Sequence, residues 1–129
     1  MKVAVGCDHA GLALKNALKA LLESWGHEVA DLGCYCQDSV DYPDYAAEVG
    51  RSVAAGEYET GILICGTGLG MAIAANKIKG VRAVVAHDTF SARMSRAHNN
   101  ANVLALGARV IGQGLAEEIV KVWLSTEFE

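Results

Sequence analysis

Short runs of apolar residues alternate with amphipathic stretches along this chain. Five runs have the length of strands in a protein interior, and they cover residues 2–7, 27–32, 61–65, 81–86 and 103–106. The run Gly-Ile-Leu-Ile-Cys at residues 61–65 contains no charged residue, which is typical of a strand that is buried on both faces. The pattern therefore predicts five short strands.

Between these runs, apolar residues recur at helical spacing. Leu14, Leu18 and Leu22 predict a helix, and Gly26 is its expected stop. Four more helices are predicted at residues 43–55, from the glycine-rich turn through residue 75, at 89–98 and at 115–124. Thr89 is the expected N-terminal cap of the helix that it begins.

Strand and helix alternate five times. This order predicts an α/β fold, a Rossmann-like three-layer α/β/α sandwich around a five-stranded parallel sheet. In such sheets, ligands bind outside the carboxyl ends of the strands. We expect this edge to carry residues 7–9, residues 65–70, His87 and Asp88, whereas His98 to Asn100 lie at a helix end before the last strand.

Composition narrows the classes of protein. The 129 residues fit one domain spanning 1–129, and the net charge of −4 argues against a nucleic-acid-binding surface. No apolar run approaches a membrane span, and the first residues lack a secretion signal, so we expect a cytoplasmic protein. The four cysteines include no Cys-x-x-Cys pair, which predicts free thiols and no metal site.

A glycine-rich loop follows the third predicted strand, which ends in Cys65. Gly66, Gly68 and Gly70 let the backbone turn tightly and approach a ligand closely. Because the loop leads into a helix, its free N–H groups are expected to bind an anion. The same helix terminus favours the thiolate of Cys65, which then takes a proton from carbon or attacks as a nucleophile. Thr67 adds a hydroxyl group to this turn.

Two other interpretations of the loop stay open at this stage. Cys65 can simply end a buried strand, with glycines that only turn the chain. The loop can also bind a dinucleotide, with Asp88 in the place of the acid that binds a ribose. A dinucleotide-binding loop has Gly-x-Gly-x-x-Gly, whereas here the third glycine comes one residue early and Met71 occupies its place.

Other polar residues are candidates for the same site. Asp8 and His9 follow the first predicted strand and are expected to bind substrate hydroxyls and a phosphate, respectively, unless Asp8 only caps a helix. His98 is a candidate acid and base near neutral pH, although histidine is also common at helix ends. Arg109 is either a phosphate ligand or a surface charge. The sequence identifies no partner for His87.

Four motifs together resemble a known family. They read Val-Gly-Cys-Asp-His-Ala-Gly at residues 5–11, Asp-Tyr-Pro-Asp at 41–44, Cys-Gly-Thr-Gly-Leu-Gly at 65–70 and His-Asn-Asn-Ala-Asn at 98–102. In this order they are similar to ribose-5-phosphate isomerase type B, whose family also contains the galactose-6-phosphate isomerase subunits. The resemblance covers residues 1–129. It implies an aldose–ketose isomerase of ribose 5-phosphate and ribulose 5-phosphate that uses no metal and no cofactor.

The resemblance also implies a role for each matching residue. Cys65 is the base that moves a proton between C1 and C2 through an enediolate, Thr67 lies near the moving proton, and His98 helps to open the furanose ring. The implied binding contacts are Asp8 and Asn99 for sugar oxygens, His9 and Arg109 for the phosphate, and Gly66, Thr67, Gly68, Leu69 and Gly70 for the anionic intermediate.

Members of this family are dimers or larger, with active sites shared between subunits. We therefore expect a homodimer or a dimer of dimers in which His98, Asn99 and Arg109 serve the partner's pocket. Family members usually continue past the equivalent of Glu129 with a basic tail that helps to hold the phosphate, so we expect weaker phosphate binding without it. The alternatives are a galactose-6-phosphate or other hexose-phosphate isomerase, an inactive subunit, and a nucleotide-binding module. The presence of His98 argues against a galactose-6-phosphate isomerase subunit.

Overall fold

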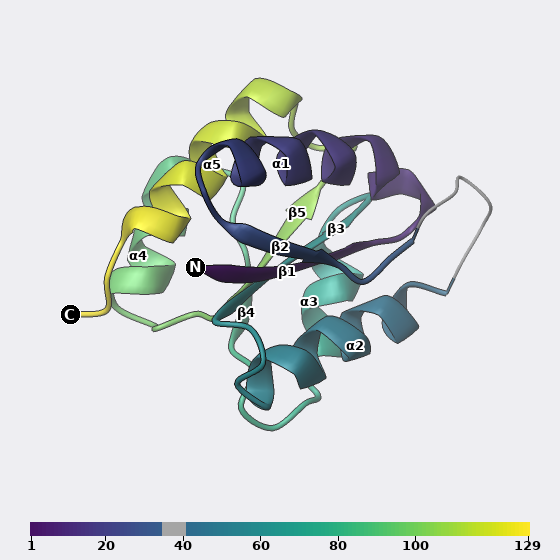
Figure 1. Ribbon diagram of the computed structural model, residues 1–129, viewed down its shortest axis with the longest axis horizontal. Helices are drawn as coiled ribbons and strands as arrows, with labels where there is room; N and C mark the ends of the chain where they lie inside the picture. Colours follow the sequence, from purple (N-terminus) through teal and green to yellow (C-terminus); the bar gives the residue numbers. More distant parts are fainter. Residues whose placement is uncertain (35–40) are drawn as a thin grey trace.

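The computed structural model describes residues 1–34 and 41–129, and its strands form one sheet (Figure 1). The strands are β1 (Lys2–Cys7), β2 (Glu28–Asp31), β3 (Thr60–Cys65), β4 (Ala83–Val85) and β5 (Val103–Gly107). They lie in the order β2-β1-β3-β5-β4. Every neighbouring pair is parallel, which confirms the predicted five-stranded parallel sheet.

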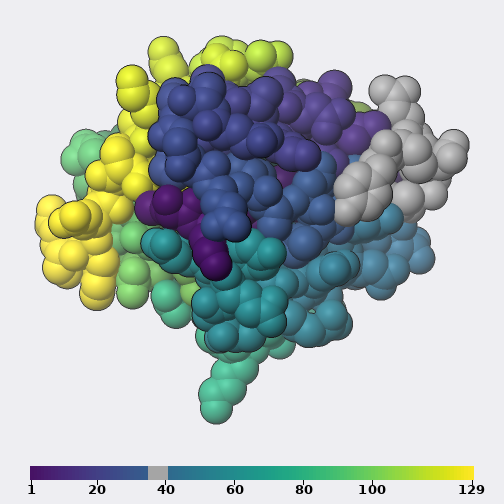
Figure 2. All heavy atoms as spheres, in the orientation of Figure 1, coloured from purple at the N-terminus to yellow at the C-terminus, as the bar shows by residue number. Residues whose placement is uncertain are grey.

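Helices cover both faces of the sheet. One face packs against α1 (Leu12–Ser24), α4 (Thr89–Ala97) and α5 (Gln113–Ser125), and the other against α2 (Tyr42–Ala54) and α3 (Leu69–Ala75). A short 3-10 helix, η1 (His9–Gly11), joins β1 to α1. Figure 1 shows the sheet between α1 and α5 above and α2 below, and in Figure 2 the atoms of the first 34 residues fill the middle of the same view. The predicted three layers are confirmed.

Strand β3 runs through the centre of the molecule. All six of its residues are buried, which accounts for the apolar sequence of residues 61–65, and the hydroxyl of the buried Thr60 donates to the Asn102 carbonyl at 3.1 Å. Ile62 and Ile64 belong to the hydrophobic cluster under α1 and α5, whereas Leu63 and Cys65 belong to the cluster under α2 and α3. Successive side chains of a strand point to opposite faces, so Cys65 points toward the layer that contains the glycine loop's helix.

The strands and helices lie where the sequence predicts them, with bounds that differ by one or two residues, and two predicted helix ends can be compared directly. Gly26 has a φ of +89° just after α1, which confirms it as the stop. The prediction of Thr89 as the cap of α4 is wrong, because the carboxylate of Asp88 accepts the N–H of Ser91 at 2.6 Å and Thr89 is already helical. Asp88 has the extended backbone that a cap requires, and the two bonds from Ser91 lower its pKa.

Candidate active site

The candidate site lies between the carboxyl ends of β1 and β3. At this point of the sheet the strand order reverses, and such a switch point is where open α/β sheets bind ligands. The N–H of Asp8 donates to the Ile64 carbonyl at 3.1 Å, which holds the two strand ends together. A Cβ on Gly11 would lie 2.5 Å from the same carbonyl oxygen, so only glycine permits this approach.

The glycine loop wraps around the sulfur of Cys65. Gly68 has a φ of +81° and its N–H donates to the Sγ of Cys65 at 3.0 Å. The N–H groups of Gly66 and Thr67 donate to no acceptor within residues 1–34 and 41–129. The side chain of Thr67 is exposed, and its Oγ1 accepts the N–H of Leu69 at 3.3 Å. The loop therefore presents two free donors and a hydroxyl beside a thiol, as the predicted anion cradle requires.

Two further side chains border this loop. A Cβ on Gly66 would lie 3.4 Å from Nη1 of Arg109, so the guanidinium lies over the loop of its own chain. The N–H of Arg109 donates to the Gly66 carbonyl at 3.0 Å, which fixes that placement. A Cβ on Gly70 would lie 2.6 Å from the ring of Tyr42, so this half-exposed ring forms a rim of the site.

Asp8 and His9 reach the same edge from β1. One oxygen of Asp8 accepts the N–H groups of Ala10 at 2.9 Å and Gly11 at 3.2 Å, which confirms that it caps a helix. Its other oxygen makes no hydrogen bond with the described residues. The Nδ1 of His9 is buried and has no hydrogen-bond partner within the part of the chain that the structure describes. Since buried polar atoms are normally paired, His9 is suited to a ligand.

His98 and Asn99 lie far from Cys65 in the same chain. Helix α4 runs antiparallel to the strands and ends at the start of β5, where the Asn102 carbonyl accepts the N–H of Gly61 at 3.0 Å. Gly61 and Cys65 are separated by most of β3, roughly 13 Å at about 3.3 Å per residue. The structure thus brings Asp8, His9, residues 65–70 and Arg109 together at one edge and leaves His98 and Asn99 at the other.

The rest of the His-Asn-Asn-Ala-Asn motif has a structural role. Asn100 has a φ of +52°, a left-handed conformation that asparagine tolerates, and it turns the chain from α4 toward β5. The side chain of Asn102 accepts the N–H of Arg82 at 2.7 Å and donates to the Gly80 carbonyl at 2.9 Å. His98 and Asn99 are exposed, and within the described ranges their side chains form no hydrogen bond.

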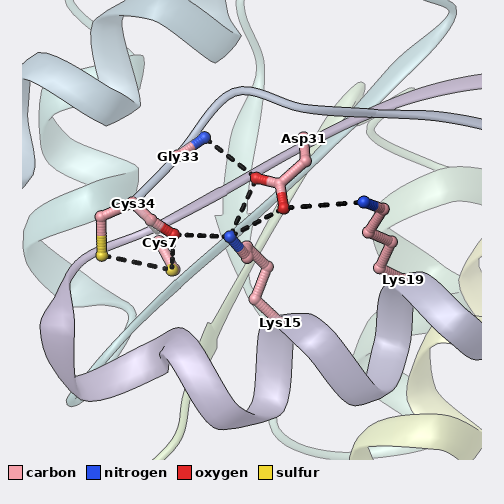
Figure 3. Close-up of polar contacts among 6 residues, drawn as sticks. All are labelled: Cys7, Lys15, Lys19, Asp31, Gly33 and Cys34. Carbon is pink, nitrogen blue, oxygen red and sulfur yellow. Dashed lines mark hydrogen bonds and ion pairs between the residues drawn. The ribbon is translucent and has the colours of Figure 1, made fainter. Parts of the chain in front are cut away.

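A buried ion pair supports the end of β1 (Figure 3). The Nζ of Lys15 lies 2.8 Å from Oδ2 of Asp31 and donates to the Cys34 carbonyl at 2.5 Å. The same carboxylate accepts the N–H of Gly33 at 3.0 Å. The Cys34 N–H donates to the Cys7 carbonyl at 3.0 Å, so this network holds the segment after β2 against the residue that precedes Asp8. The sequence did not reveal it, because a lysine on an amphipathic helix normally indicates the exposed face.

The structure does not support the interpretation of the loop as a dinucleotide site, because the acid expected to bind the ribose is engaged elsewhere. Asp88 accepts both the N–H and the hydroxyl of Ser91, so its carboxylate serves the start of α4. Within the described ranges, no three His, Cys, Asp or Glu side chains gather where a metal ion could bind. Nor does any helix among these residues have the length and apolarity needed to cross a bilayer.

The fold and the site together define a class of protein. It is an all-parallel α/β protein that carries a thiol and an anion-binding loop at the switch point of its sheet. The model of the ribose/galactose isomerase family matches residues 3–129. The chain is 52% identical over 128 residues to ribose-5-phosphate isomerase B of Escherichia coli, covering 99% of this chain and 86% of that protein. It is 46% identical over 133 residues to D-erythrulose-4-phosphate isomerase of Pectobacterium atrosepticum, covering 100% of this chain and 86% of that protein.

A solved structure shows the same fold. Ribose-5-phosphate isomerase B of Clostridium thermocellum superposes with a TM-score of 0.98 at 52% sequence identity, covering 99% of this chain and 86% of that one. The chain therefore belongs to the ribose/galactose isomerase family, as the four sequence motifs indicated.

Proposed function

We propose that this protein is an aldose–ketose isomerase that interconverts ribose 5-phosphate and ribulose 5-phosphate. The observation that carries this proposal is the convergence of the Cys65 sulfur, the free N–H groups of Gly66 and Thr67, and the Arg109 guanidinium at one strand edge. A base, an oxyanion site and a cation for phosphate are what this isomerisation requires. The reaction belongs to pentose phosphate metabolism, and we place it in the cytoplasm.

Cys65 acts as the base in the proposed mechanism. Its thiolate takes the proton from C2 of the open-chain aldose and returns it to C1, and the intermediate between the two steps is an enediolate. The N–H groups of Gly66 and Thr67 bind the oxyanion, while the Thr67 hydroxyl assists the proton transfer between O1 and O2. The N–H of Gly68 donates to this sulfur at 3.0 Å, which holds the base within the loop.

The two ends of the substrate have different partners. Asp8 offers its second carboxylate oxygen to a sugar hydroxyl. The buried Nδ1 of His9 and the Arg109 guanidinium bind the phosphate, since phosphate oxygens accept hydrogen bonds from both groups. Leu69 and Gly70 complete the wall of the cradle, against which the Tyr42 ring packs.

The active site is shared between two subunits of a homodimer in this proposal. His98 opens the furanose ring and Asn99 binds a sugar oxygen in the partner's pocket, which suits their exposure at the edge opposite Cys65. Leu69 and Ile73 lie one turn apart on α3 and are 57% and 64% exposed, which gives a second copy an apolar surface beside the loop. The placement of Arg109 over its own Gly66 instead favours a role in the site of its own chain.

The length of the sugar is the open part of the proposal. The Pectobacterium relative is named for a four-carbon sugar phosphate, and the family description names galactose as well as ribose. Measurement of kcat/KM on ribose 5-phosphate, erythrulose 4-phosphate and galactose 6-phosphate decides between them. We expect the highest value for ribose 5-phosphate, and a tenfold preference for another sugar would replace it as the substrate.

Proton exchange in heavy water tests the chemistry. The wild-type protein should introduce deuterium at C2 of ribose 5-phosphate while ribulose 5-phosphate forms. Cys65→Ala should keep the far-UV circular dichroism spectrum and exchange at least ~100-fold more slowly, the usual contribution of a positioned base. Full exchange by Cys65→Ala would sink the proposed mechanism.

Subunit complementation tests the shared site. Cys65→Ala and His98→Ala chains are each expected to be nearly inactive. When they are mixed and reassembled, half of the dimers contain one chain of each kind, and each of these has one intact site if the sites are shared. Activity should then recover to about a quarter of the wild-type value. No recovery in a mixture that demonstrably exchanges subunits would contradict a shared site.

A further inference from the structure

His87 contacts the sheet next to the candidate site although it lies outside it. Strand β4 pairs with β5 as far as Val85 and Ala105, and two residues further along the same register would place His87 opposite Gly107. There β4 has already ended, and the N–H of Gly107 donates instead to Nε2 of the His87 ring at 2.9 Å. The imidazole nitrogen therefore accepts the hydrogen bond of the Gly107 N–H in place of the carbonyl that a longer β4 would have provided.

Gly107 is part of the floor beneath the glycine loop. It is the register partner of Cys65 on β3. A Cβ on Gly107 would lie 2.8 Å from the Cα, C and O atoms of Thr67, so the backbone of Thr67 rests directly on this residue. A Cβ on Gly68 would likewise lie 3.1 Å from the carbonyl carbon of Leu106. The position of this floor sets the position of the loop.

The loop in turn determines how Cys65 is solvated. The N–H of Gly68 donates to the Cys65 sulfur at 3.0 Å, and the next N–H groups after the floor hold the loop from its other side. The Ala108 N–H donates to the Cys65 carbonyl at 2.8 Å, and the Arg109 N–H donates to the Gly66 carbonyl at 3.0 Å. A shift of the end of β5 therefore moves the glycine loop, and with it the Gly68 N–H that donates to the thiol.

We infer that His87 is a positioning residue for Cys65, which it serves by holding the Gly107 amide and with it the floor of the glycine loop. The ring acts as an acceptor at Nε2, so its neutral form carries the hydrogen on Nδ1. Among the described residues, the ring forms no hydrogen bond with the loop's free N–H groups or with the sulfur. The inference rests on the proposed function only in taking Cys65 as the catalytic base.

Two substitutions separate the acceptor from the bulk of the ring. In His87→Gln the Oε1 atom is as many bonds from Cα as Nε2 is in histidine, and it accepts a hydrogen bond. In His87→Leu the side chain fills similar space and accepts none. His87→Leu should lower kcat about tenfold, the effect of one ordinary hydrogen bond, and should leave KM within about twofold. His87→Gln should restore kcat to within about twofold of the wild-type value.

Alkylation of Cys65 gives a readout that does not depend on isomerase activity. With iodoacetamide at pH 7.5 and mass-spectrometric detection of the Cys65 peptide, His87→Leu should react at least about threefold more slowly than wild type and His87→Gln at the wild-type rate, because loss of the acceptor for the Gly107 N–H displaces the loop that surrounds the sulfur. Thermal melts establish that both variants are folded at the assay temperature. Equal losses in both variants, or a wild-type rate in His87→Leu, would overturn the inference. A wild-type protein without isomerase activity would instead overturn the proposed function, and the alkylation rates would still decide the role of His87.

Discussion

Two neighbouring strands of this sheet each end in a cysteine, and the surroundings of the two thiols differ. Cys7 ends β1 with its sulfur 3.7 Å from the sulfur of Cys34 and 3.8 Å from the Cys34 carbonyl. Burial raises the pKa of the Cys7 thiol to about 12, because the backbone hydrogen bond at Cys34 and the charge of Lys15 offset only part of the cost of a buried charge, and the Cys34 thiol adds to that cost. Cys65 ends β3, and its sulfur accepts the N–H of Gly68. Burial alone does not distinguish them, because Cys7 is fully buried and Cys65 is 6% exposed.

The segment that follows each strand makes the difference. After β1 the chain enters a tight 3-10 turn, and the ion pair of Lys15 and Asp31 seals the thiol under the segment from Gly33 to Cys34. After β3 the glycines turn the backbone tightly enough for the Gly68 N–H to donate to the sulfur. A strand-end cysteine thus becomes a base or a core residue according to the loop that follows it.

The largest expected effect separates the two thiols by activity. Cys65→Ala should lower kcat for ribose 5-phosphate by about 10²–10⁴, the range for loss of a positioned general base. Cys7→Ala, on the adjacent strand, should leave kcat within about threefold, because its thiol is neutral and sealed away from the substrate edge. Coupled assays of ribulose 5-phosphate formation measure both. Comparable losses in the two variants would contradict different roles for the two thiols.

The second-largest expected effect follows from breaking the ion pair of Lys15 and Asp31 that covers Cys7. Lys15→Met removes the cation from a pair whose side chains are 1% and 12% exposed, and leaves the Asp31 carboxylate without its principal counter-charge. We expect a loss of about 3 kcal/mol in the free energy of unfolding, as for other broken buried pairs. Lys19→Met is the matched control, because its Nζ lies 4.0 Å from the same carboxylate and is partly exposed, and it should cost below about 1 kcal/mol in urea titrations. A small effect of Lys15→Met, comparable to that of the control, would contradict a structural role for the pair.

The fold and much of the site could be predicted because their signals are local. Apolar runs predict all five strands, and the strand-end rule predicts from the sequence that Asp8, His9 and Cys65 share one edge of the sheet. The Thr89 cap was wrong by one residue, since both Asp88 and Thr89 are good caps and only the backbone decides between them.

The remaining features depend on contacts between distant parts of the chain. Arg109 lies over Gly66 across 43 positions, and His87 meets Gly107 across 20. The sequence pattern predicts Lys15 to be a surface residue, whereas the folded chain brings its Nζ to the Asp31 carboxylate and the Cys34 carbonyl. No spacing rule encodes such pairs, because the sheet order β2-β1-β3-β5-β4 brings them together.

The third effect concerns the loop that makes Cys65 different. Gly68→Ala places a Cβ at a φ of +81° and 3.1–3.3 Å from backbone atoms of Leu106 and Ala105. The expected loss of stability is about 2 kcal/mol, from left-handed strain with an added steric contribution, together with a loss of activity. Gly26→Ala is the control, since its φ of +89° gives the same strain with nothing within 4 Å of the new Cβ. It should cost about 1 kcal/mol in thermal or urea unfolding and leave kcat unchanged, and equal costs at both sites would argue against a tightly seated loop.

The smallest effect is a dependence on pH that belongs to Cys7 alone. The pKa of this thiol is about 12 in the folded protein against 9.0 for an ordinary cysteine, so the folded state favours the protonated form. This contribution to stability is fully present below pH 9 and is lost as the pH rises toward 12, because the unfolded chain then releases a proton that the folded chain keeps. The free energy of unfolding of the wild type should therefore fall relative to Cys7→Ala by up to about 1.4 kcal/mol per pH unit above pH 9. Urea titrations under reducing conditions between pH 7 and 10.5 measure this difference.

Val5→Ala, a truncation on the same buried strand without a titratable group, is the control for this prediction, and it should differ from wild type by a constant amount over that range. A constant difference for Cys7→Ala as well would mean that its thiol is no harder to ionise than one in water, and the contrast between the two strand ends would then rest on the glycine loop alone.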